Sequence, residues 1–183
     1  YHKWLSYQKK LKEERNHSLQ SLEFPFSYRE GQRKMVSSVY HAIGASRQIF
    51  IQAPTGVGKT MSTIFPAVRA VGEGKGETIF YLTAKTITRT VAQEAFEVLR
   101  EKGMKYKVVT ITAKEKLCFM DETKCDPVHC PYARGHFDRV NDAVYELWTT
   151  KSRYDRETIR EQAEKWQVCP FEMCLDLSVW VDA

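Results

Sequence analysis

An eight-residue stretch, APTGVGKT at residues 53–60, constrains the fold of this chain more than any other feature. It follows a short run of β-forming residues at 48–51 and precedes an amphipathic segment that predicts a helix from about residue 59. Glycines between a strand and a helix let the backbone curl, so that successive amide N–H groups point inward at an anion. The stretch therefore predicts an α/β fold with a phosphate-binding loop.

The residue types in this loop suit a nucleoside triphosphate. Gly56 and Gly58 permit the curl, and the helix N-terminus adds a partial positive charge. Lys59 is expected to reach the β- and γ-phosphates and the Thr60 hydroxyl to coordinate magnesium, which makes these two the predicted catalytic residues. Ala53 stands where the general pattern has glycine, so a glycine turn beside an ordinary lysine is the alternative interpretation.

A glutamine lies upstream of the loop, in the sequence Tyr28-Arg29-Glu30-Gly31-Gln32. A glutamine amide can both accept from and donate to an adenine edge, which suits a purine nucleotide held at the loop. A surface residue that contacts no ligand is the alternative interpretation of Gln32.

Helix and strand patterns alternate through residues 24–113. Apolar residues at helical spacing predict three helices, at 35–43, from about 59, and at 91–99. Gly44 is expected to close the first helix as a left-handed C-cap, and Gly103 is expected to close the last. Runs of β-formers predict three strands, at 48–51, 78–82 and 106–111. This alternation is typical of a parallel sheet with helical crossovers. The polar residues 1–23 predict a separate solvated helix.

A change of composition indicates an insert. Residues 114–174 hold all five cysteines and few strand formers, and they predict helices near 137–148 and 155–166, the second capped by Asp155. Such a segment needs its own source of stability. We therefore expect a small α-helical insert, after which residues 175–183 return toward the first domain.

The cysteines follow the pattern C-x6-C-x4-C-x38-C-x4-C. Disulfides fit poorly because the number of cysteines is odd. Structural zinc takes four ligands, usually in tight pairs; one gap here qualifies, and His129 is a further candidate ligand. An iron–sulfur cubane also takes four thiolates and tolerates wider, uneven spacing, because the cluster is larger than one ion. The spacing alone leaves zinc and a cluster open.

Helical geometry distinguishes Cys174 from the other cysteines. Cys130 and Cys169 each precede a proline, and Pro170 suits the first turn of a helix. Cys174 follows Cys169 by five residues, about 140° around that helix, so the two cannot easily face one centre. Since free cysteine is commonly buried, we expect Cys174 in the core. The predicted metal ligands are Cys118, Cys125, Cys130 and Cys169.

Together these motifs resemble those of the iron–sulfur DNA helicases of superfamily 2, the XPD and DinG family. The resemblance rests on YREGQ, APTGVGKT, YLTAKT, TAKEKLC with two further cysteines, and CPFEM, in that order. It implies a RecA-like motor domain at residues 24–113 that uses ATP and magnesium, and an insert at 114–174 that holds a [4Fe-4S] cluster. It also implies an ATP-driven 5′→3′ helicase on single-stranded or forked DNA, with a role in DNA repair.

The resemblance also assigns residues. It implies that the nucleotide is bound by Arg29, Gln32, Thr55, Gly56, Val57, Gly58, Lys59 and Thr60. It implies DNA contacts at Thr83 and Lys85, at the carboxyl end of the second predicted strand, where ligands meet a parallel sheet. Basic and aromatic residues around the cysteines suit a surface that binds phosphates and stacks on bases: Lys114, Lys116, Lys124, Arg134, Arg139, Tyr132 and Phe137. The aromatic residues could instead pack the insert.

Two parts of the family pattern do not occur in this sequence. It contains no Asp-Glu-x-His stretch to orient magnesium and the attacking water, and no second motor domain with an arginine finger. We therefore expect the front part of a helicase, inactive alone, whose partner is the C-terminal motor domain of the same protein. The alternatives are a zinc-containing P-loop ATPase or switch protein without helicase activity, and a non-catalytic nucleic-acid-binding module.

Composition limits the class of protein. A hydrophobic share of 43% with 28% charged residues is ordinary for a globular chain of 183 residues. The net charge of +5 permits a polyanionic partner. The chain has no apolar run long enough to span a membrane and no signal-peptide pattern, which predicts a cytoplasmic protein without membrane partners, associated with the nucleoid in a bacterium.

Overall fold

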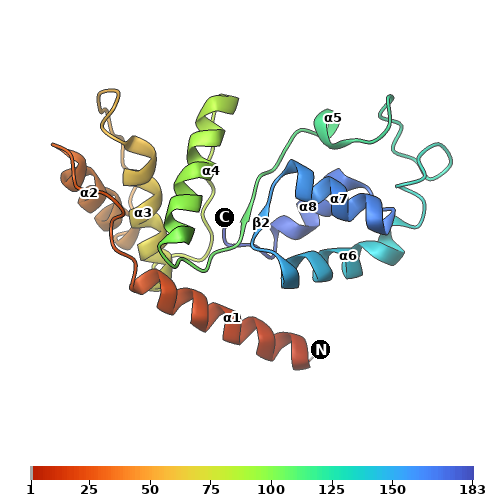
Figure 1. The fold of residues 1–183 in the computed structure, drawn as a ribbon, viewed down its shortest axis with the longest axis horizontal. Coiled ribbons are helices and arrows are strands. Elements are labelled where there is room, and N and C mark those ends of the chain that lie inside the picture. The colour runs from red at the N-terminus through yellow and green to blue at the C-terminus, as the bar shows by residue number, and fades with distance from the viewer. Residues whose placement is uncertain (1) are drawn as a thin grey trace. The chain divides into compact units, whose positions relative to one another are not determined.

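The computed structural model describes the backbone of residues 2–183 and the side chains of residues 6–183. The chain divides into two compact units, residues 1–106 and residues 107–183. Both are mainly helical, as Figure 1 shows. None of the helices in the described residues is both long and apolar enough to cross a membrane.

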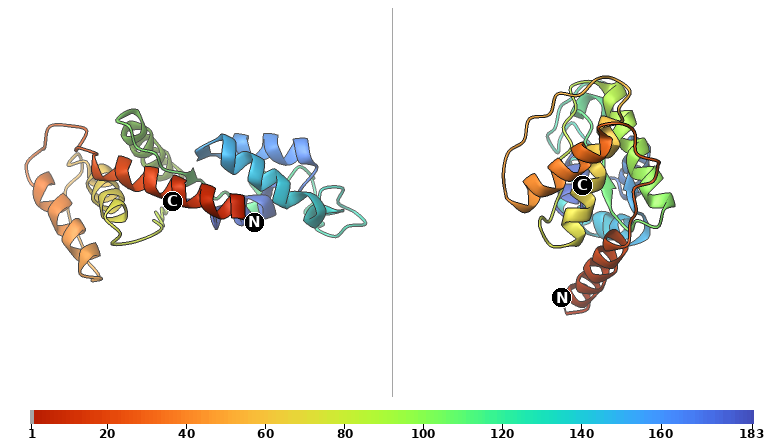
Figure 2. Two further views of the ribbon diagram at one scale, coloured as in Figure 1. Left: turned by 90° about the horizontal axis from the view of Figure 1, so that it is seen from below. Right: turned by 90° about the vertical axis from the view of Figure 1, so that its left-hand side faces the viewer.

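The first unit consists of four helices packed around α3. They are α1 (His2–Gln20), α2 (Gln32–Gly44), α3 (Lys59–Gly72) and α4 (Thr86–Glu101). Helix α3 contacts each of the other three, and Figures 1 and 2 show it between α2 and α4. Its apolar face is buried because Ile64 and Val68 pack into the centre of the unit. A Cβ on Gly72 would lie 2.5 Å from the Cβ of Leu19, so this glycine allows α1 and α3 to approach closely.

The helices of the first unit confirm the predicted periodicity, but one predicted cap was wrong. Gly103 has φ 98° and closes α4, as expected. Gly44 remains helical, and Ser46 instead adopts the left-handed conformation with φ 52°. The reason is a capping motif two residues later, in which Arg47 N–H donates to the Ala42 carbonyl and Ser46 N–H to the Ile43 carbonyl.

The predicted parallel sheet of the first unit does not form in the described residues. Segments 48–51 and 78–82 form no ladder, and they leave Phe50, Phe80 and Leu82 exposed by 93%, 80% and 90%. A strand needs the backbone of a neighbouring strand, and no described segment pairs with these two.

The third predicted strand is also corrected. It shortens to β1 (Val108–Val109), which pairs in parallel with β2 (Arg153–Tyr154), a segment that the sequence had placed inside the insert. This two-residue ladder is the sheet of the described chain, and it belongs to the second unit.

The second unit is a bundle of three helices with a short fourth. The helices are α5 (Lys114–Leu117), α6 (His136–Thr150), α7 (Arg156–Trp166) and α8 (Pro170–Ser178). Leu147, Ile159 and Met173 are buried where the three long helices meet. Two predicted helix starts are confirmed: Asp155 caps α7 by accepting from Thr158 N–H at 3.0 Å, and Pro170 is the first residue of α8.

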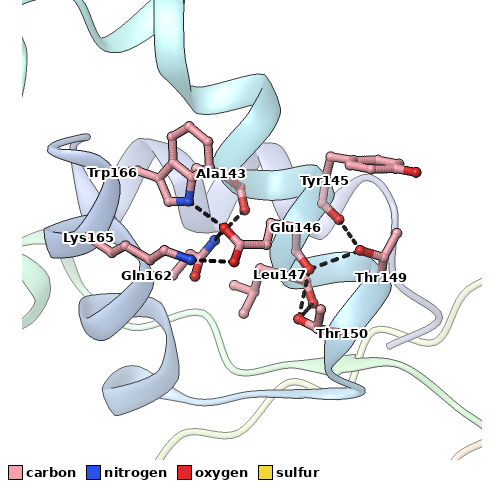
Figure 3. Close-up of polar contacts among 9 residues, drawn as sticks. All are labelled: Ala143, Tyr145, Glu146, Leu147, Thr149, Thr150, Gln162, Lys165 and Trp166. Atoms are coloured by element: carbon pink, nitrogen blue, oxygen red, sulfur yellow. Dashed lines mark hydrogen bonds and ion pairs between the residues drawn. The ribbon is translucent and has the colours of Figure 1, made fainter.

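A polar contact at the edge of this bundle joins α6 to α7 (Figure 3). The Glu146 carboxylate accepts from Trp166 Nε1 at 2.7 Å, from Gln162 Nε2 at 3.2 Å, and from Lys165 Nζ. The hydrogen bond from Lys165, followed by that from Trp166, holds the pKa of Glu146 below its ordinary value. The contact therefore favours an ionised carboxylate between the two helices.

The second unit begins and ends at the same place. The Lys107 carbonyl accepts from Asp182 N–H at 2.9 Å, and Val109 N–H donates to the Ala183 carbonyl at 2.8 Å. Lys107 Nζ donates to the carbonyls of Trp148 and Lys151 at the end of α6. Burial lowers the pKa of Lys107, against the opposing effect of Asp182. The first and last segments of the unit are thus held together by backbone and side-chain bonds.

Candidate functional site

The phosphate loop has the geometry that its glycines predict. Gly56 and Gly58 have φ of 82° and 77°, in the left-handed region that favours glycine. Gly58 is the N-cap of α3 and Lys59 its first residue, and no side chain caps the first turn. The uncapped N-terminus of α3 that follows the two glycines is suited to an anion.

Lys59 lies against the loop. Its Nζ donates to the Ala53 carbonyl at 3.0 Å and to the Pro54 carbonyl at 2.8 Å. Arg29 donates to the Gly56 carbonyl from the segment before α2. The structure thus brings two cations from different segments to the loop that the sequence singled out.

Gln32 packs directly behind the loop. It is only 4% exposed, and its Oε1 accepts from Arg29 N–H at 3.0 Å. A Cβ on Gly58 would lie 2.6 Å from Gln32 Nε2, so a larger residue at this position would require the Gln32 side chain to move. In this arrangement Gln32 supports the loop, and its contact with adenine stays a prediction.

The remaining predicted nucleotide contacts surround the same loop. Thr55 is exposed, while Val57 and Thr60 are half-buried. A groove of about 600 Å³ lies between the start of α2 and residues 49–57, and Gly31, Met35, Pro54 and Val57 are among the residues that line it. The groove offers space beside the loop on the side of α2.

The two predicted DNA contacts lie at the start of α4. Thr83 is half-buried and Lys85 is exposed. Lys85 is the N-cap of α4, and its carbonyl accepts from the Thr88 hydroxyl at 2.8 Å and from Arg89 N–H at 3.2 Å. The backbone here is therefore fixed by the helix, while the Lys85 side chain faces solvent.

The four predicted metal ligands line a single small cavity in the second unit. Its walls are largely apolar and include Phe119, Tyr132 and Phe171 as well as the four thiols, namely Cys118, Cys125, Cys130 and Cys169. All five cysteines are free thiols. The cysteines come from the end of α5, the long loop before α6 and the start of α8, so the fold brings three separate segments together.

Cys174 is a core residue, as the helical geometry predicted. Its side chain is fully buried and does not line the cavity. Burial raises the pKa of Cys174 to about 11, against a weaker opposing hydrogen bond from Thr112. Its absence from the cavity lining separates Cys174 from the other four cysteines.

Charges around the cavity act on the thiols. Burial raises the pKa of Cys169, although N–H groups of Glu172 and Phe171 in the first turn of α8 act against this. Lys114 is hydrogen-bonded to Cys125, which is the main cause of the raised pKa of Lys114. Its Nζ also lies 3.6 Å from Glu172 Oε1 and 5.3 Å from the centre of the Phe171 ring. A cation beside two thiols would offset the charge of thiolates.

The donor set was compared with the two metal alternatives. Across the described residues, no three His, Cys, Asp or Glu side chains are placed to hold a metal ion. His129, the alternative zinc ligand, lies outside the cavity, and its Nδ1 is 2.8 Å from Asp126 Oδ1. The four thiols that line the cavity are a donor type that both a cluster and structural zinc take, so the residue types fit either group, and a bound cluster stays a prediction.

The arginines near the cysteines donate to backbone carbonyls, although Arg134 is itself exposed. Arg134 donates to the carbonyls of Pro127 and Val128, and Arg139 donates to those of Trp166 and Gln167. Arg160, which the sequence analysis did not single out, donates to the carbonyls of Leu117 and Cys118. Its position next to the buried Ile159 on α7 was the available signal.

Comparison with known families now decides the class of protein. The DEAD/DEAH box helicase family matches residues 29–133, more than half of the chain. The chain belongs to this family. The matched range begins at Arg29 and contains the phosphate loop and three of the cysteines. Membership implies a RecA-like α/β fold and the class of ATP-dependent helicases, for which ATP and magnesium are the expected ligands.

A helicase relative supports the same assignment. The chain is 29% identical over 123 residues to a probable ATP-dependent helicase of Methanocaldococcus jannaschii. The aligned part covers 65% of this chain and 18% of that protein. No solved structure matches the chain.

Proposed function

We propose that this chain is the nucleotide-binding front part of an iron–sulfur DNA helicase that moves 5′→3′ on single-stranded or forked DNA and acts in DNA repair. The observation that carries the proposal is the convergence of four cysteines from three segments on one cavity, in a helicase-family chain that also has a phosphate loop. Few chemical roles other than metal or cluster binding require four thiols around one apolar space.

In the nucleotide site, Lys59 and the loop amides hold the triphosphate. Lys59 Nζ exchanges the carbonyls of Ala53 and Pro54 for β- and γ-phosphate oxygens, which are stronger acceptors because they are charged. Thr60, in the first turn of α3, supplies a magnesium ligand. Arg29 and Gln32 hold the loop from behind and border the space for the base.

The loop by itself does not supply a residue that orients the attacking water. The extended segments 48–51 and 78–82 leave apolar side chains exposed, as inner strands do when their neighbours come from elsewhere. We infer that further segments of a longer protein complete this sheet and bring the acidic residue and the second motor domain. DNA then contacts Thr83 and Lys85 at the start of α4.

In the second unit, Cys118, Cys125, Cys130 and Cys169 would hold the [4Fe-4S] cluster. These four residues lie in segments that have little regular structure of their own, and a bound cluster would link them. The pairing of residues 107–109 with 182–183 supports a unit that leaves and rejoins another domain at one point. Lys114 offsets the charge of the thiolates.

Nucleotide binding is tested by titrating the chain with a fluorescent ATP analogue in the presence of magnesium. Lys59→Ala should weaken binding at least tenfold, about the worth of one charged hydrogen bond. Lys102→Ala is the matched control, since Lys102 is exposed at the end of α4 and does not line the groove. Equal affinity of the parent and the Lys59 variant would remove the nucleotide assignment.

The cluster is tested by purifying the chain without oxygen and measuring iron, sulfide and zinc. The proposal expects about four irons per chain and broad absorbance near 400 nm, as a cubane requires. Replacing any of the four cavity cysteines with serine should remove the iron, and Cys174→Ser should retain it. One zinc per chain without iron would favour the zinc-containing ATPase or switch protein.

A further inference from the structure

The segments that carry the cysteines need support from elsewhere in the unit. Cys118 ends the four-residue helix α5, and residues 119–135 contain no helix or strand. Figures 1 and 2 show this long loop extending away from the α6–α8 bundle. A loop without a ladder can hold its shape only through bonds to side chains or to the rest of the fold.

Arg160 supplies such bonds to the first cysteine. It extends from α7, and its Nη1 donates to the Leu117 carbonyl at 2.6 Å and to the Cys118 carbonyl at 3.0 Å. The guanidinium also lies 4.4 Å from the centre of the Phe119 ring. Three consecutive residues, the cysteine among them, are therefore fixed to one half-buried arginine.

Arg139 holds the segment that precedes Cys169, the last of the four cavity cysteines. From α6, its Nε donates to the Trp166 carbonyl at 2.9 Å, and its Nη2 to the carbonyls of Gln167 at 2.6 Å and Arg134 at 2.7 Å. The first two carbonyls end α7 immediately before Cys169. The Arg139 guanidinium thus links the residues before Cys169 to the end of the long loop.

Two further residues complete this frame. Arg134 Nε donates to the Pro127 carbonyl at 2.9 Å and its Nη2 to that of Val128 at 3.2 Å, between Cys125 and Cys130. The Cys169 N–H donates to Nδ1 of the buried His136 at 3.2 Å. Every segment that carries a cavity cysteine therefore has a side chain of α6, α7 or the adjoining loop bonded to its backbone.

We propose that Arg160 and Arg139 are positioning residues that hold the cysteine segments in register for the cluster, rather than contacts for DNA. The proposal rests on the proposed function, since it concerns the same cavity. Its physical basis is that these guanidinium groups are already bonded to two or three carbonyls each. A guanidinium bound to a phosphate would have to give up bonds that keep a ligand segment in place.

The lysines of the same region differ from these arginines. Lys116 lies two residues before Cys118 and is exposed. Lys124 is also exposed and its Nζ lies 2.7 Å from the Glu122 carboxylate, but it lines the cysteine cavity as well. Lys116 does not line the cavity, so it can meet a polyanion without disturbing a cysteine segment, and we assign nucleic-acid contact to Lys116.

The test compares Arg160→Met and Arg139→Met with Lys116→Met, which removes the same charge from the segment of Cys118 without removing a backbone anchor. Each variant of the chain is reconstituted with ferrous iron and sulfide, and the loss of absorbance near 400 nm is followed after adding a chelator. Both arginine variants should lose the cluster at least tenfold faster than the parent, as outer-sphere changes do for metal sites. Lys116→Met should lose it at the parent rate and bind single-stranded DNA more weakly.

Arg160→Lys separates positioning from general loss of structure. A lysine can still donate to the two carbonyls, so this variant should retain the cluster longer than Arg160→Met. The far-UV circular dichroism spectra of the two metal-free variants should match that of the metal-free parent. Cluster loss from Arg160→Met and Arg139→Met at the parent rate would overturn the positioning proposal and leave the cluster assignment standing. Equally fast loss from Lys116→Met would also overturn it, because charge rather than anchoring would then be the cause. A parent chain that takes up no iron removes both.

Discussion

The two units of this chain differ in how completely they cover their apolar residues. In the second unit, Tyr154, Ile159 and Met173 are fully buried, and the first and last segments are bonded to each other. In the first unit, the helices bury their own faces, but the extended segments with Phe50 and Phe80 lie open to solvent. The comparison teaches that the second unit closes its own core, whereas the first leaves apolar residues of two irregular segments exposed.

The largest expected effect is a cavity in the closed core. Ile159→Ala should destabilise the second unit by about 2–5 kcal/mol, because the surrounding helices cannot collapse fully into the space. Phe50→Ala in the first unit is the control and should change stability by less than about 0.5 kcal/mol. Urea unfolding followed by circular dichroism measures both. Similar losses at the two positions would mean that the first unit is covered as well as the second.

A smaller effect is expected at the phosphate loop, where the first unit is tightly packed. Gly58→Ala should cost about 1–2 kcal/mol for a left-handed backbone, and its methyl would also meet Gln32 Nε2. Gly74→Ala is matched, with φ 75° and no atom within 4 Å of the added Cβ. Both variants should lose stability, but nucleotide-analogue affinity should fall only for Gly58→Ala. A parallel fall for Gly74→Ala would indicate that backbone strain alone is responsible.

Acid should weaken the second unit through the cap of α7. Partial burial acts to raise the pKa of Asp155, but hydrogen bonds from Thr158 and the charge of Arg153 outweigh it and lower the pKa. A lowered pKa means that the stabilisation is complete above the ordinary aspartate pKa of about 4 and is lost as the pH falls through the folded value.

The cap variants measure this effect. Asp155→Ala should cost about 1 kcal/mol at neutral pH. Asp155→Asn should retain most of the cap and reduce the dependence of unfolding on pH below about 4. If the stability of the asparagine variant falls with acid as steeply as that of the parent, the acid sensitivity belongs to other carboxylates, of which Glu146 is the next candidate.

The smallest effect is expected at the open segments of the first unit. Leu82→Ser removes an apolar side chain that is almost entirely exposed, so stability should change by less than about 0.5 kcal/mol. Self-association, measured by light scattering, should decrease because an exposed apolar segment without a partner favours aggregation. A clear loss of stability would show that Leu82 is covered in solution and would weaken the contrast between the units.

Much of the candidate site could be predicted because its determinants are local. The glycines at 56 and 58 adopt the expected left-handed backbone, and Pro170 starts the expected helix. The distinction of Cys174 from the other cysteines depends only on rotation along one helix and is confirmed by its burial. The four remaining cysteines line one cavity, and that they hold a metal or cluster stays a prediction.

The sequence by itself determined the features whose causes lie within about one helical turn: the curl of the phosphate loop, the caps of α4 and α7, and the faces of the helices. Tertiary structure alone decided that β1 pairs with β2, that the segments at 48–51 and 78–82 have no described partner, and that Arg139 and Arg160 turn toward backbone carbonyls. The reason is that strand pairing and the direction of a long side chain depend on residues far away in the chain. An arginine has the same pattern in a sequence whether its guanidinium meets a phosphate or a carbonyl.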